Sequence, residues 1–226
     1  MRFERSGWVR QIDLTSLMGC VPQGGMITLE TNPGRYAIAG TVMCTIAPPP
    51  EDAEHTDQQV RATAGIESTR TMQQDVSYGL RQLVDVALKA LSPGINDPTT
   101  AQDAIFHAAA VLLELLRRSP NEVEHIGEGD RRLVLCEQPT HGELVRLAFD
   151  ETRRAASDHP TVCIYLLEAL ELLHESLGAA GLHDRLDALA DEARLVVAGC
   201  GAADLVPQDV QLVRAAYAKR FGSTVS

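Results

Sequence analysis

The chain has 226 residues, of which 45% are hydrophobic and 23% are charged, as in an ordinary globular protein. Its 20 lysines and arginines against 31 acidic residues give a net charge of −11. This charge argues against DNA, RNA or an anionic lipid surface as partner, because each requires positive charge facing phosphate. The five cysteines are widely spaced without a Cys-x-x-Cys pair, so neither a disulfide framework nor a zinc ribbon is indicated, and a reducing cytosol fits best.

The sequence shows neither a secretion signal nor a membrane-spanning segment. The first five residues lead directly into a strand-like segment rather than into an apolar signal region. The longest apolar runs, 104–116 and 162–173, contain charged residues and are shorter than the roughly 20 residues that a spanning helix requires. We therefore expect the chain itself to be soluble.

Residues 6–47 have the pattern of short β-strands. Strands are expected around 8–12, 26–30, 35–38 and 41–46, with a helical turn at 14–20 and a tight turn at Asn32-Pro33-Gly34. The glycine rhythm is like that of biotinyl and lipoyl carrier barrels, but those carriers need a lysine, and none precedes Lys89. The pattern predicts a small barrel-like β module over residues 1–48, without a cofactor.

The run Pro48-Pro49-Pro50, followed by two acidic residues, predicts a stiff linker and a domain boundary. Beyond it the sequence is mostly helical in pattern. Residues 121–130 read as a polar loop, and 132–137 as an isolated strand or an extended segment. Helices are expected at 51–62, 71–91, 98–118, 140–157, 160–178, 182–199 and 207–221. The fold class is thus α+β, a β module at 1–48 followed by a predominantly α-helical bundle at 49–226.

The segment 71–91 is an amphipathic helix by its periodicity. Its apolar face is expected to hold Met72, Val76, Leu80, Leu83, Val84, Ala87, Ala90 and Leu91. The opposite face holds Gln74, Tyr78, Arg81, Gln82, Asp85 and Lys89. Because Arg81–Asp85 and Asp85–Lys89 are four residues apart, both pairs can form surface ion pairs worth a few tenths of a kcal/mol, roughly. The polar face is therefore either solvated or a binding face.

The break after this helix has clear causes. Ser92 precedes a proline and is pushed out of helical geometry, and Gly94 permits a tight reversal. Asp97 as N-cap and Pro98 at the first helical position then predict a new helix. Two interpretations remain. The residues either serve only to end one helix and start the next, or they form a ligand site that consists of Asn96, Asp97, Thr99 and Thr100.

Other groups of residues that could form a metal site or a catalytic site are incomplete. Glu171 and His174 have the spacing of a di-iron helical bundle, but the only other such pair, Glu122 and His125, lies in the expected polar loop. His107 is expected to be satisfied by a neighbour such as Asp103, four residues earlier. We predict no metal site and no catalytic residues.

Several short blocks of the sequence resemble those of a known protein family. They are Arg70-Thr71, Gln74-Asp75, the run from Leu80 to Asp85, Ala90-Leu91-Ser92-Pro93, and the run from Ile95 to Ala101. The opening run from Ser6 to Asp13 and the Pro33-Gly34 and Ala39-Gly40 pairs belong with them. Together they closely resemble the bacterial predicted membrane proteins of domain-of-unknown-function family 2254, over nearly the whole chain. The resemblance implies several membrane-spanning helices ahead of this region, which this chain lacks, and it carries no known catalytic residues.

We therefore expect an interaction or regulatory domain, sensing a small ligand, on the cytoplasmic side of a bacterial inner-membrane protein. Its partners would be the absent transmembrane segments and further copies of itself in a homo-oligomer, not nucleic acid. The candidate ligand-binding residues are Arg70, Gln74, Asp75, Tyr78, Arg81, Asp85, Asn96, Asp97, Thr99 and Thr100. One alternative is an enzyme with a polar site around Asp75, Arg81, Asp85 and Asp97; another is a stand-alone cytosolic protein that has lost its membrane part.

Overall fold

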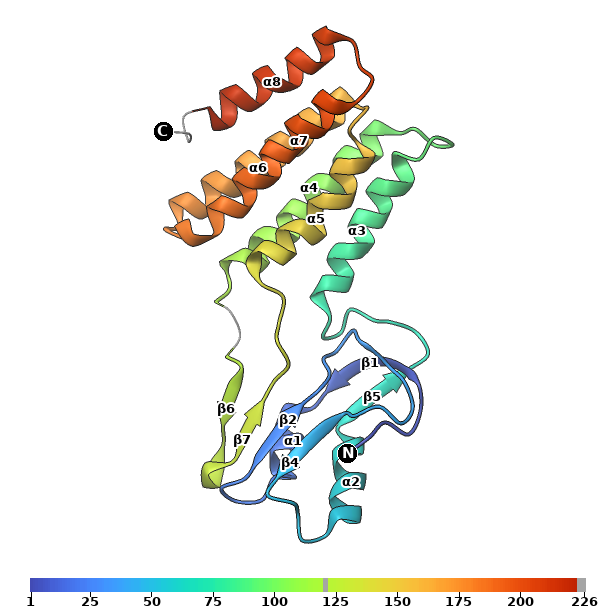
Figure 1. Ribbon diagram of the computed structural model, residues 1–226, viewed down its shortest axis with the longest axis vertical. Helices are drawn as coiled ribbons and strands as arrows, with labels where there is room; N and C mark the ends of the chain where they lie inside the picture. The colour runs from blue at the N-terminus through green and yellow to red at the C-terminus, as the bar shows by residue number, and fades with distance from the viewer. Residues whose placement is uncertain (120–121, 223–226) are drawn as a thin grey trace. The chain divides into compact units, whose positions relative to one another are not determined.

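The computed structural model describes residues 1–119 and 122–222 and has an α+β fold (Figure 1). The chain divides into two compact units. The β unit comprises Met1–Tyr78 and Pro120–Gln138, and the helical unit comprises Gly79–Ser119 and Pro139–Ser226. Each unit has its own core of buried apolar residues.

The β unit contains two sheets. In the first, β1 (Gly7–Ile12) lies between β3 (Tyr36–Ala37) and β5 (Ala64–Glu67), and both pairings are antiparallel. The second has the strand order β4-β2-β7-β6, from β2 (Met26–Leu29), β4 (Cys44–Ala47), β6 (Glu124–Ile126) and β7 (Arg132–Val134). Strands β2 and β7 are parallel, and the other neighbours are antiparallel. Because each sheet ends in two edge strands, the described strands form no closed barrel, and the expected barrel-like arrangement is not confirmed.

Two helices complete the β unit. The expected helical turn is confirmed as α1 (Leu14–Gly19), and α2 (Ala53–Ala62) follows the proline run. An aspartate caps each helix: Asp13 accepts from the amides of Thr15 and Ser16, and Asp52 from that of His55. The Ser16 hydroxyl also donates to Asp13. This hydrogen bond and those from the amides of Ser16 and Thr15 lower the pKa of the Asp13 carboxyl, the hydroxyl having the largest effect.

The bounds of the two compact units differ from the domain boundary between residues 48 and 49 that the proline run indicated. Strand β5, which the sequence pattern missed, pairs with β1, and β7 pairs with β2, so segments beyond the proline run complete both sheets. The expected polar loop contains β6 and a short 3-10 helix, Glu128–Asp130, and residue 121 lies outside the described residues. Strand β7 is not isolated, because it also pairs with β6.

The helical unit follows the expected helices closely. They are α3 (Val76–Ala90), whose first turn belongs to the β unit, α4 (Pro98–Arg117), α5 (His141–Ala155), α6 (Pro160–Ala179), α7 (Leu186–Ala202) and α8 (Pro207–Phe221). A 3-10 turn, His183–Arg185, precedes α7 where the sequence suggested regular helix. Leu80 and Leu91 share one core with Ala101 and Ile105, so the segments on either side of the turn at 92–97 pack together.

Helix α3 starts five residues later than expected. Asp75 accepts a hydrogen bond from the Tyr78 amide at 3.0 Å, so the chain before Val76 is fixed as a cap and not as helix. Met72 therefore lies ahead of the helix, and Met72 and Val76, both expected on the buried face, are exposed.

Candidate functional site

Arg70 is the centre of a group of side chains in the β unit. Its Nε donates to Oδ2 of Asp75 at 2.7 Å, and Asp75 is only 6% exposed. The other oxygen of Asp75 accepts from the Tyr78 amide. Asp75 therefore neutralises a cation and satisfies the first turn of α3 at the same time.

Two aromatic rings enclose the Arg70 guanidinium. Its carbon lies 5.1 Å from the centroid of Trp8, on β1, and 4.7 Å from that of Tyr78, on α3. Trp8 in turn meets Tyr36 edge-to-face at 5.3 Å. Cation–π attraction at these distances strengthens as the group is desolvated, and Arg70 is 29% exposed. One side chain thus joins β1 to the start of α3.

Gly34 closes this group against Asp75. A β-carbon at position 34 would overlap the Asp75 carboxylate, and Gly34 has a φ of +86°. Its amide donates to the Val9 carbonyl at 2.7 Å, which fixes the turn against β1. We call Trp8, Gly34, Arg70, Asp75 and Tyr78 the Arg70 cluster.

The segment leading into α3 is also attached to β1. The side-chain oxygen of Gln74 accepts from the Ile12 amide at 3.0 Å, and Gln73 donates to Gln11 at 2.6 Å. Four predicted site residues, Arg70, Gln74, Asp75 and Tyr78, are therefore brought together along one strand. Trp8 and Gly34 were absent from the predicted site, and only their place in the resembling blocks pointed to them.

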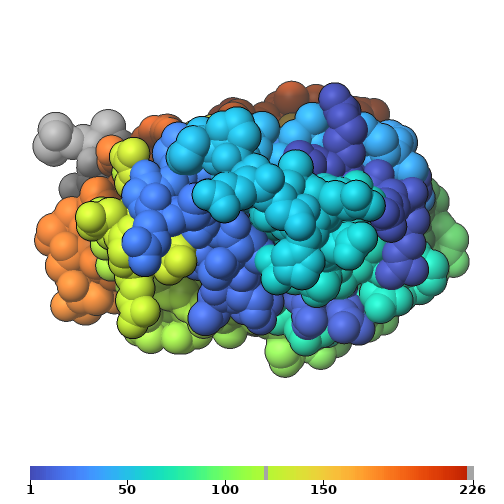
Figure 2. Space-filling model, turned by 90° about the horizontal axis from the view of Figure 1, so that it is seen from below, coloured from blue at the N-terminus to red at the C-terminus, as the bar shows by residue number. Residues whose placement is uncertain are grey.

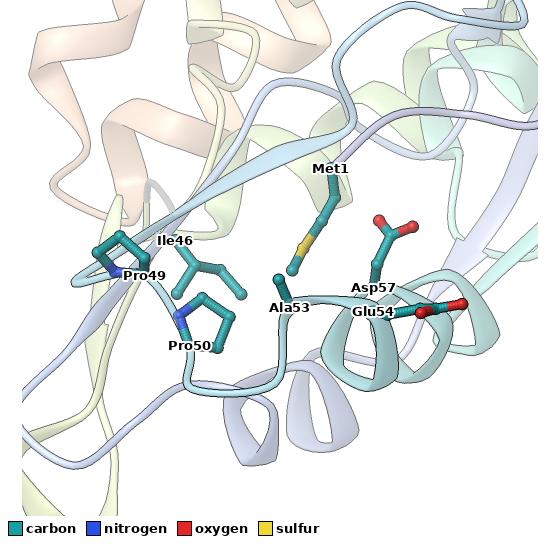
Figure 3. Close-up of a pocket in the computed structure, with 7 residues that line it drawn as sticks. All are labelled: Met1, Ile46, Pro49, Pro50, Ala53, Glu54 and Asp57. Carbon is teal, nitrogen blue, oxygen red and sulfur yellow. The ribbon is translucent and has the colours of Figure 1, made fainter.

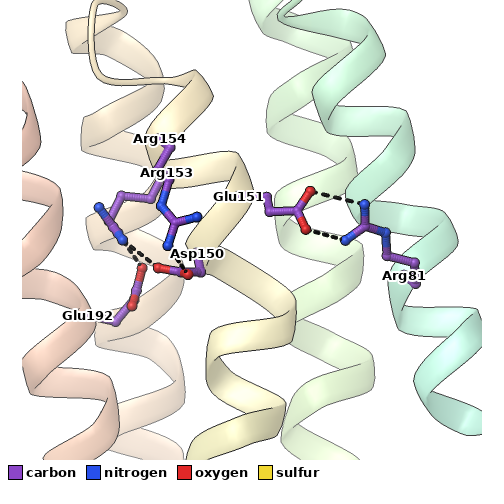
Figure 4. A network of polar contacts seen from close by, with 6 residues as sticks. All are labelled: Arg81, Asp150, Glu151, Arg153, Arg154 and Glu192. Atoms are coloured by element: carbon purple, nitrogen blue, oxygen red, sulfur yellow. Dashed lines mark hydrogen bonds and ion pairs between the residues drawn. The ribbon is translucent and has the colours of Figure 1, made fainter.

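Arg81 and Asp85 lie on the part of α3 that belongs to the helical unit. Their predicted ion pair is confirmed at 3.0 Å, whereas the structure shows none between Asp85 and Lys89. Arg81 also binds both carboxylate oxygens of Glu151 on α5, as Figure 4 shows. The hydrogen bond from Arg81 lowers the pKa of Glu151. The polar face of α3 is thus partly occupied by α5.

A second ion-pair group in Figure 4 was not foreseen from the sequence. Arg153 on α5 contacts Asp150 of its own helix and Glu192 of α7, the latter at 2.7 Å. Glu192 is 3% exposed, and burial raises its pKa while Arg153 opposes that shift. The available signal was a glutamate among the apolar positions of α7.

The residues after the turn mainly form a helix cap. Asp97 accepts from the amides of Thr99 and Thr100, each at 3.1 Å, and from the Thr100 hydroxyl. These bonds, led by the hydroxyl, lower the pKa of Asp97. Asn96 has a φ of +48° and is exposed. The structural interpretation of this turn is therefore supported, and ligand binding by Asn96, Thr99 and Thr100 stays a prediction.

Two hollows lie on the β unit, and none of the ten predicted residues lines either one. One, of about 430 Å³, is drawn in Figure 3. It is lined by Met1, Ile46, Pro49, Pro50, Ala53, Glu54 and Asp57. The other, of about 440 Å³, lies between α1 and the β6–β7 hairpin. It is lined by Leu14, Thr15, Met18, Gly19, His125, Gly127, Glu128, Arg131 and Leu133.

The residues considered for a metal site have other partners. Glu171 pairs with Arg220 at 2.8 Å, and His174 packs edge-to-face on Phe221. His107 contacts the Asp103 carbonyl at 2.8 Å through Nδ1, as the four-residue spacing suggested. Within residues 1–119 and 122–222, no group of three or more potential ligands could hold a metal ion. None of the helices in these ranges is long and apolar enough to cross a bilayer.

Comparisons with known proteins agree with the resemblance. The family model described as Predicted membrane protein (DUF2254) matches residues 1–172. The uncharacterized proteins Rv1290c and MT1328 of Mycobacterium tuberculosis and Mb1321c of Mycobacterium bovis are each 37% identical over 108 residues. Each match covers 47% of this chain and 20% of the relative. The search of solved structures found no significant match. The family match spans most of the chain, which therefore belongs to the predicted membrane protein family DUF2254.

Proposed function

We propose that this chain is an interaction or regulatory domain of a bacterial membrane protein, in which the Arg70 cluster couples the β unit to α3. One observation carries the proposal. The Arg70 side chain contacts β1 through Trp8 and the first turn of α3 through Asp75 and Tyr78.

The coupling would act through the cap of α3. Asp75 holds the Tyr78 amide, and its position depends on Arg70 and on Gly34. A change in the β unit that moves Trp8 or Gly34 would release this cap, and an uncapped first turn loses about 1 kcal/mol of helix stability. Because α3 continues from Tyr78 into the helical unit, its first turn is an element with two states, capped and frayed.

The hollow beside α1 supports a ligand-sensing role. Leu14, Met18 and Leu133 supply apolar contacts, Thr15 and His125 supply hydrogen-bonding groups, and Glu128 and Arg131 supply one charge of each sign. This composition suits a small, largely apolar ligand with a polar group. Helix α1 follows β1 after Asp13 alone, so a ligand there would act on the strand that carries Trp8.

The predicted carboxylates favour interaction over catalysis. Asp75 is bound by Arg70, Asp85 by Arg81, and Asp97 by the amides of its own helix. Each is thereby occupied in a structural contact.

We also propose that the domain lies on the cytoplasmic side of the inner membrane and forms homo-oligomers. All five cysteines are free thiols, which supports a reducing compartment. Leu172 of α6, Leu195 of α7 and Leu212 of α8 are about half exposed, and we propose that apolar side chains of this kind form the contact between copies.

Hydrogen exchange tests the coupling. Arg70→Met should accelerate amide exchange in the first turn of α3, because the Asp75 cap loses its counterion. Arg117→Met, which removes an exposed arginine of α4, should leave that turn unchanged. Equal exchange in wild type and Arg70→Met would remove the coupling role.

A fragment screen by ligand-observed NMR tests the ligand site. Gly19 lines the hollow and has open space at its β-carbon, so Gly19→Phe should abolish binding of any fragment that the wild type holds there. Gly94, which has the same open space in the turn before α4, provides the control Gly94→Phe. A fragment lost equally in both variants, or in neither, would count against this site.

A further inference from the structure

We propose that the surface around β3 binds the headgroup region of an anionic phospholipid bilayer. This β3 surface consists of Arg2, Arg5, Trp8, Tyr36 and Ile38. The proposal rests on the chain's membership of a membrane protein family and does not depend on coupling through Arg70.

The apolar part of the β3 surface is unusually aromatic for this chain. It holds the single tryptophan and one of four tyrosines. Tyr36 is 55% exposed, Ile38 is 59% exposed, and Trp8 packs edge-to-face on Tyr36. Tryptophan and tyrosine favour the membrane–water interface because their rings are apolar with one polar group.

The basic part has no acidic partner within the described residues. Arg2 donates to the Gly40 carbonyl, after β3, at 2.6 Å, and Arg5 donates at 2.5 Å to the Ile66 carbonyl of β5, which lies on the other side of β1. These contacts fix the arginines without neutralising them. The nearby acids are already paired, Glu4 with Arg61 and Glu67 with Arg10.

Backbone contacts hold the two parts together. Phe3 donates to the Thr41 carbonyl at 3.0 Å and accepts from the Gly40 amide at 2.8 Å. Ser6 accepts from the Ala39 amide at 2.9 Å. The residues after β3 therefore run beside the first six residues, and Figure 2 shows this light-blue segment next to the dark-blue one.

The net charge of −11 does not decide against this partner. Charges farther apart than about 10 Å are largely screened at 0.1 M salt, so the local arginines dominate at the β3 surface. A second copy of the chain is the weaker candidate, because a two-fold interface here would bring the arginines of both copies together. Lipid phosphates complement them.

Tryptophan fluorescence tests the proposal, because Trp8 is the only tryptophan of the chain and packs on Tyr36 at this surface. The 226-residue chain is mixed with phosphatidylcholine vesicles, with or without phosphatidylglycerol. We expect a blue shift of the emission, and quenching by brominated lipid, with the anionic vesicles at low salt. High salt should reverse both effects.

Variants then separate the two parts of the surface. Arg2→Ala/Arg5→Ala should lower partitioning about 25-fold, since each arginine near an anionic surface contributes about fivefold. Arg117→Ala/Arg194→Ala changes the net charge equally in the helical unit and should have little effect. Ile38→Ser should weaken binding, whereas Ile95→Ser, at a similarly exposed position in the turn before α4, should not.

Three results would overturn the proposal. They are unchanged Trp8 emission with anionic vesicles, equal effects of the β3 variants and their controls, and a concentration-dependent rise in mass that Tyr36→Ser removes in the absence of lipid. The last would assign the surface to a second copy of the chain. Circular dichroism of each variant confirms that a loss of binding is not a loss of fold.

Discussion

Gly34 lies so close to Asp75 that a β-carbon at position 34 would overlap the carboxylate oxygen Oδ2. This contact places the turn after β2 against the carboxylate that binds Arg70. The absence of a side chain at position 34 is therefore what allows Asp75 to be buried.

Gly34→Ala should lower the free energy of unfolding by roughly 2–4 kcal/mol, from a strained positive φ and from displacement of Asp75. Gly40→Ala is a matched control, because Gly40 also has a φ of +86° but nothing lies near its β-carbon. The control should lose only about 1–2 kcal/mol. Urea denaturation measures both, and equal losses would show that the Asp75 contact is unimportant.

Arg185→Met should stabilise the protein by about 1–3 kcal/mol in chemical denaturation. Arg185 is 7% exposed, and its Nε and Nη2 donate to Nδ1 of His141 at 3.2 Å and to the Arg118 carbonyl at 3.5 Å. Its Nη1 has no hydrogen-bond partner among the described residues, and its carboxylate partner Asp184 lies 3.8 Å from Nε and is itself exposed. Two neutral acceptors and a distant, exposed carboxylate compensate a buried charge only in part, so its burial is costly, and methionine retains much of the volume.

Arg153→Met is the contrasting variant. Arg153 is similarly buried but has two carboxylate partners, Asp150 and Glu192. Its removal leaves Glu192 buried and uncompensated, so we expect a loss of about 3–5 kcal/mol. A change of the same sign in Arg153→Met and Arg185→Met would contradict this account.

Glu192 should make the protein less stable as pH rises. Burial raises its folded-state pKa above the ordinary value of 4.5. The folded state therefore holds the proton more tightly than the unfolded state. The resulting stabilisation is fully present below pH 4.5 and disappears as pH rises through the folded-state pKa.

Urea denaturation across this range, on wild type and Glu192→Gln, measures the effect. The wild type should lose stability relative to the variant as pH rises. Glu175→Gln, at an exposed position of α6, should follow the wild type. A parallel dependence in wild type and Glu192→Gln would exclude a raised pKa.

Asp97 should have the opposite effect to Glu192 and make the protein less stable as pH falls. Hydrogen bonds from Thr100 and Thr99 lower its folded-state pKa below 3.8, so its stabilisation is present above pH 3.8 and is lost as pH falls through the folded value. The difference in thermal stability between wild type and Asp97→Asn should therefore shrink under acid conditions. A difference that stays constant with pH would show that the carboxylate charge is not what caps α4.

The helices could be predicted because their signals are local. Asp97 with Pro98, Pro160 and Pro207 mark three starts that the structure has at the expected positions. Strand β5 could not be predicted, since Ala64–Glu67 has no alternating pattern and becomes a strand only by pairing with β1. For β7 the sequence indicated a strand or an extended segment at 132–137, but not its pairing with β2, more than 100 residues earlier.

The candidate site could be predicted only in part for the same reason. Arg70, Gln74, Asp75 and Tyr78 are neighbours in sequence, and they stay neighbours in the β unit. Trp8 and Gly34 lie far from them in the sequence, so their contacts with Arg70 and Asp75 could not be predicted, although the turn at Gly34 itself was expected. The Glu151 partner of Arg81 lies 70 residues away on another helix, so the polar face of α3 could not be known to be covered.

The parallel pairing of β2 with β7 has a consequence for synthesis on the ribosome. Residues 26–29 emerge early, but their second neighbour is complete only when residue 134 has left the exit tunnel. Until then β2 exposes one unpaired edge, which is a template for association with other nascent chains. A truncated gene product that stops after α4 would keep that edge permanently, so the shortest fragment that completes this sheet must extend past Val134.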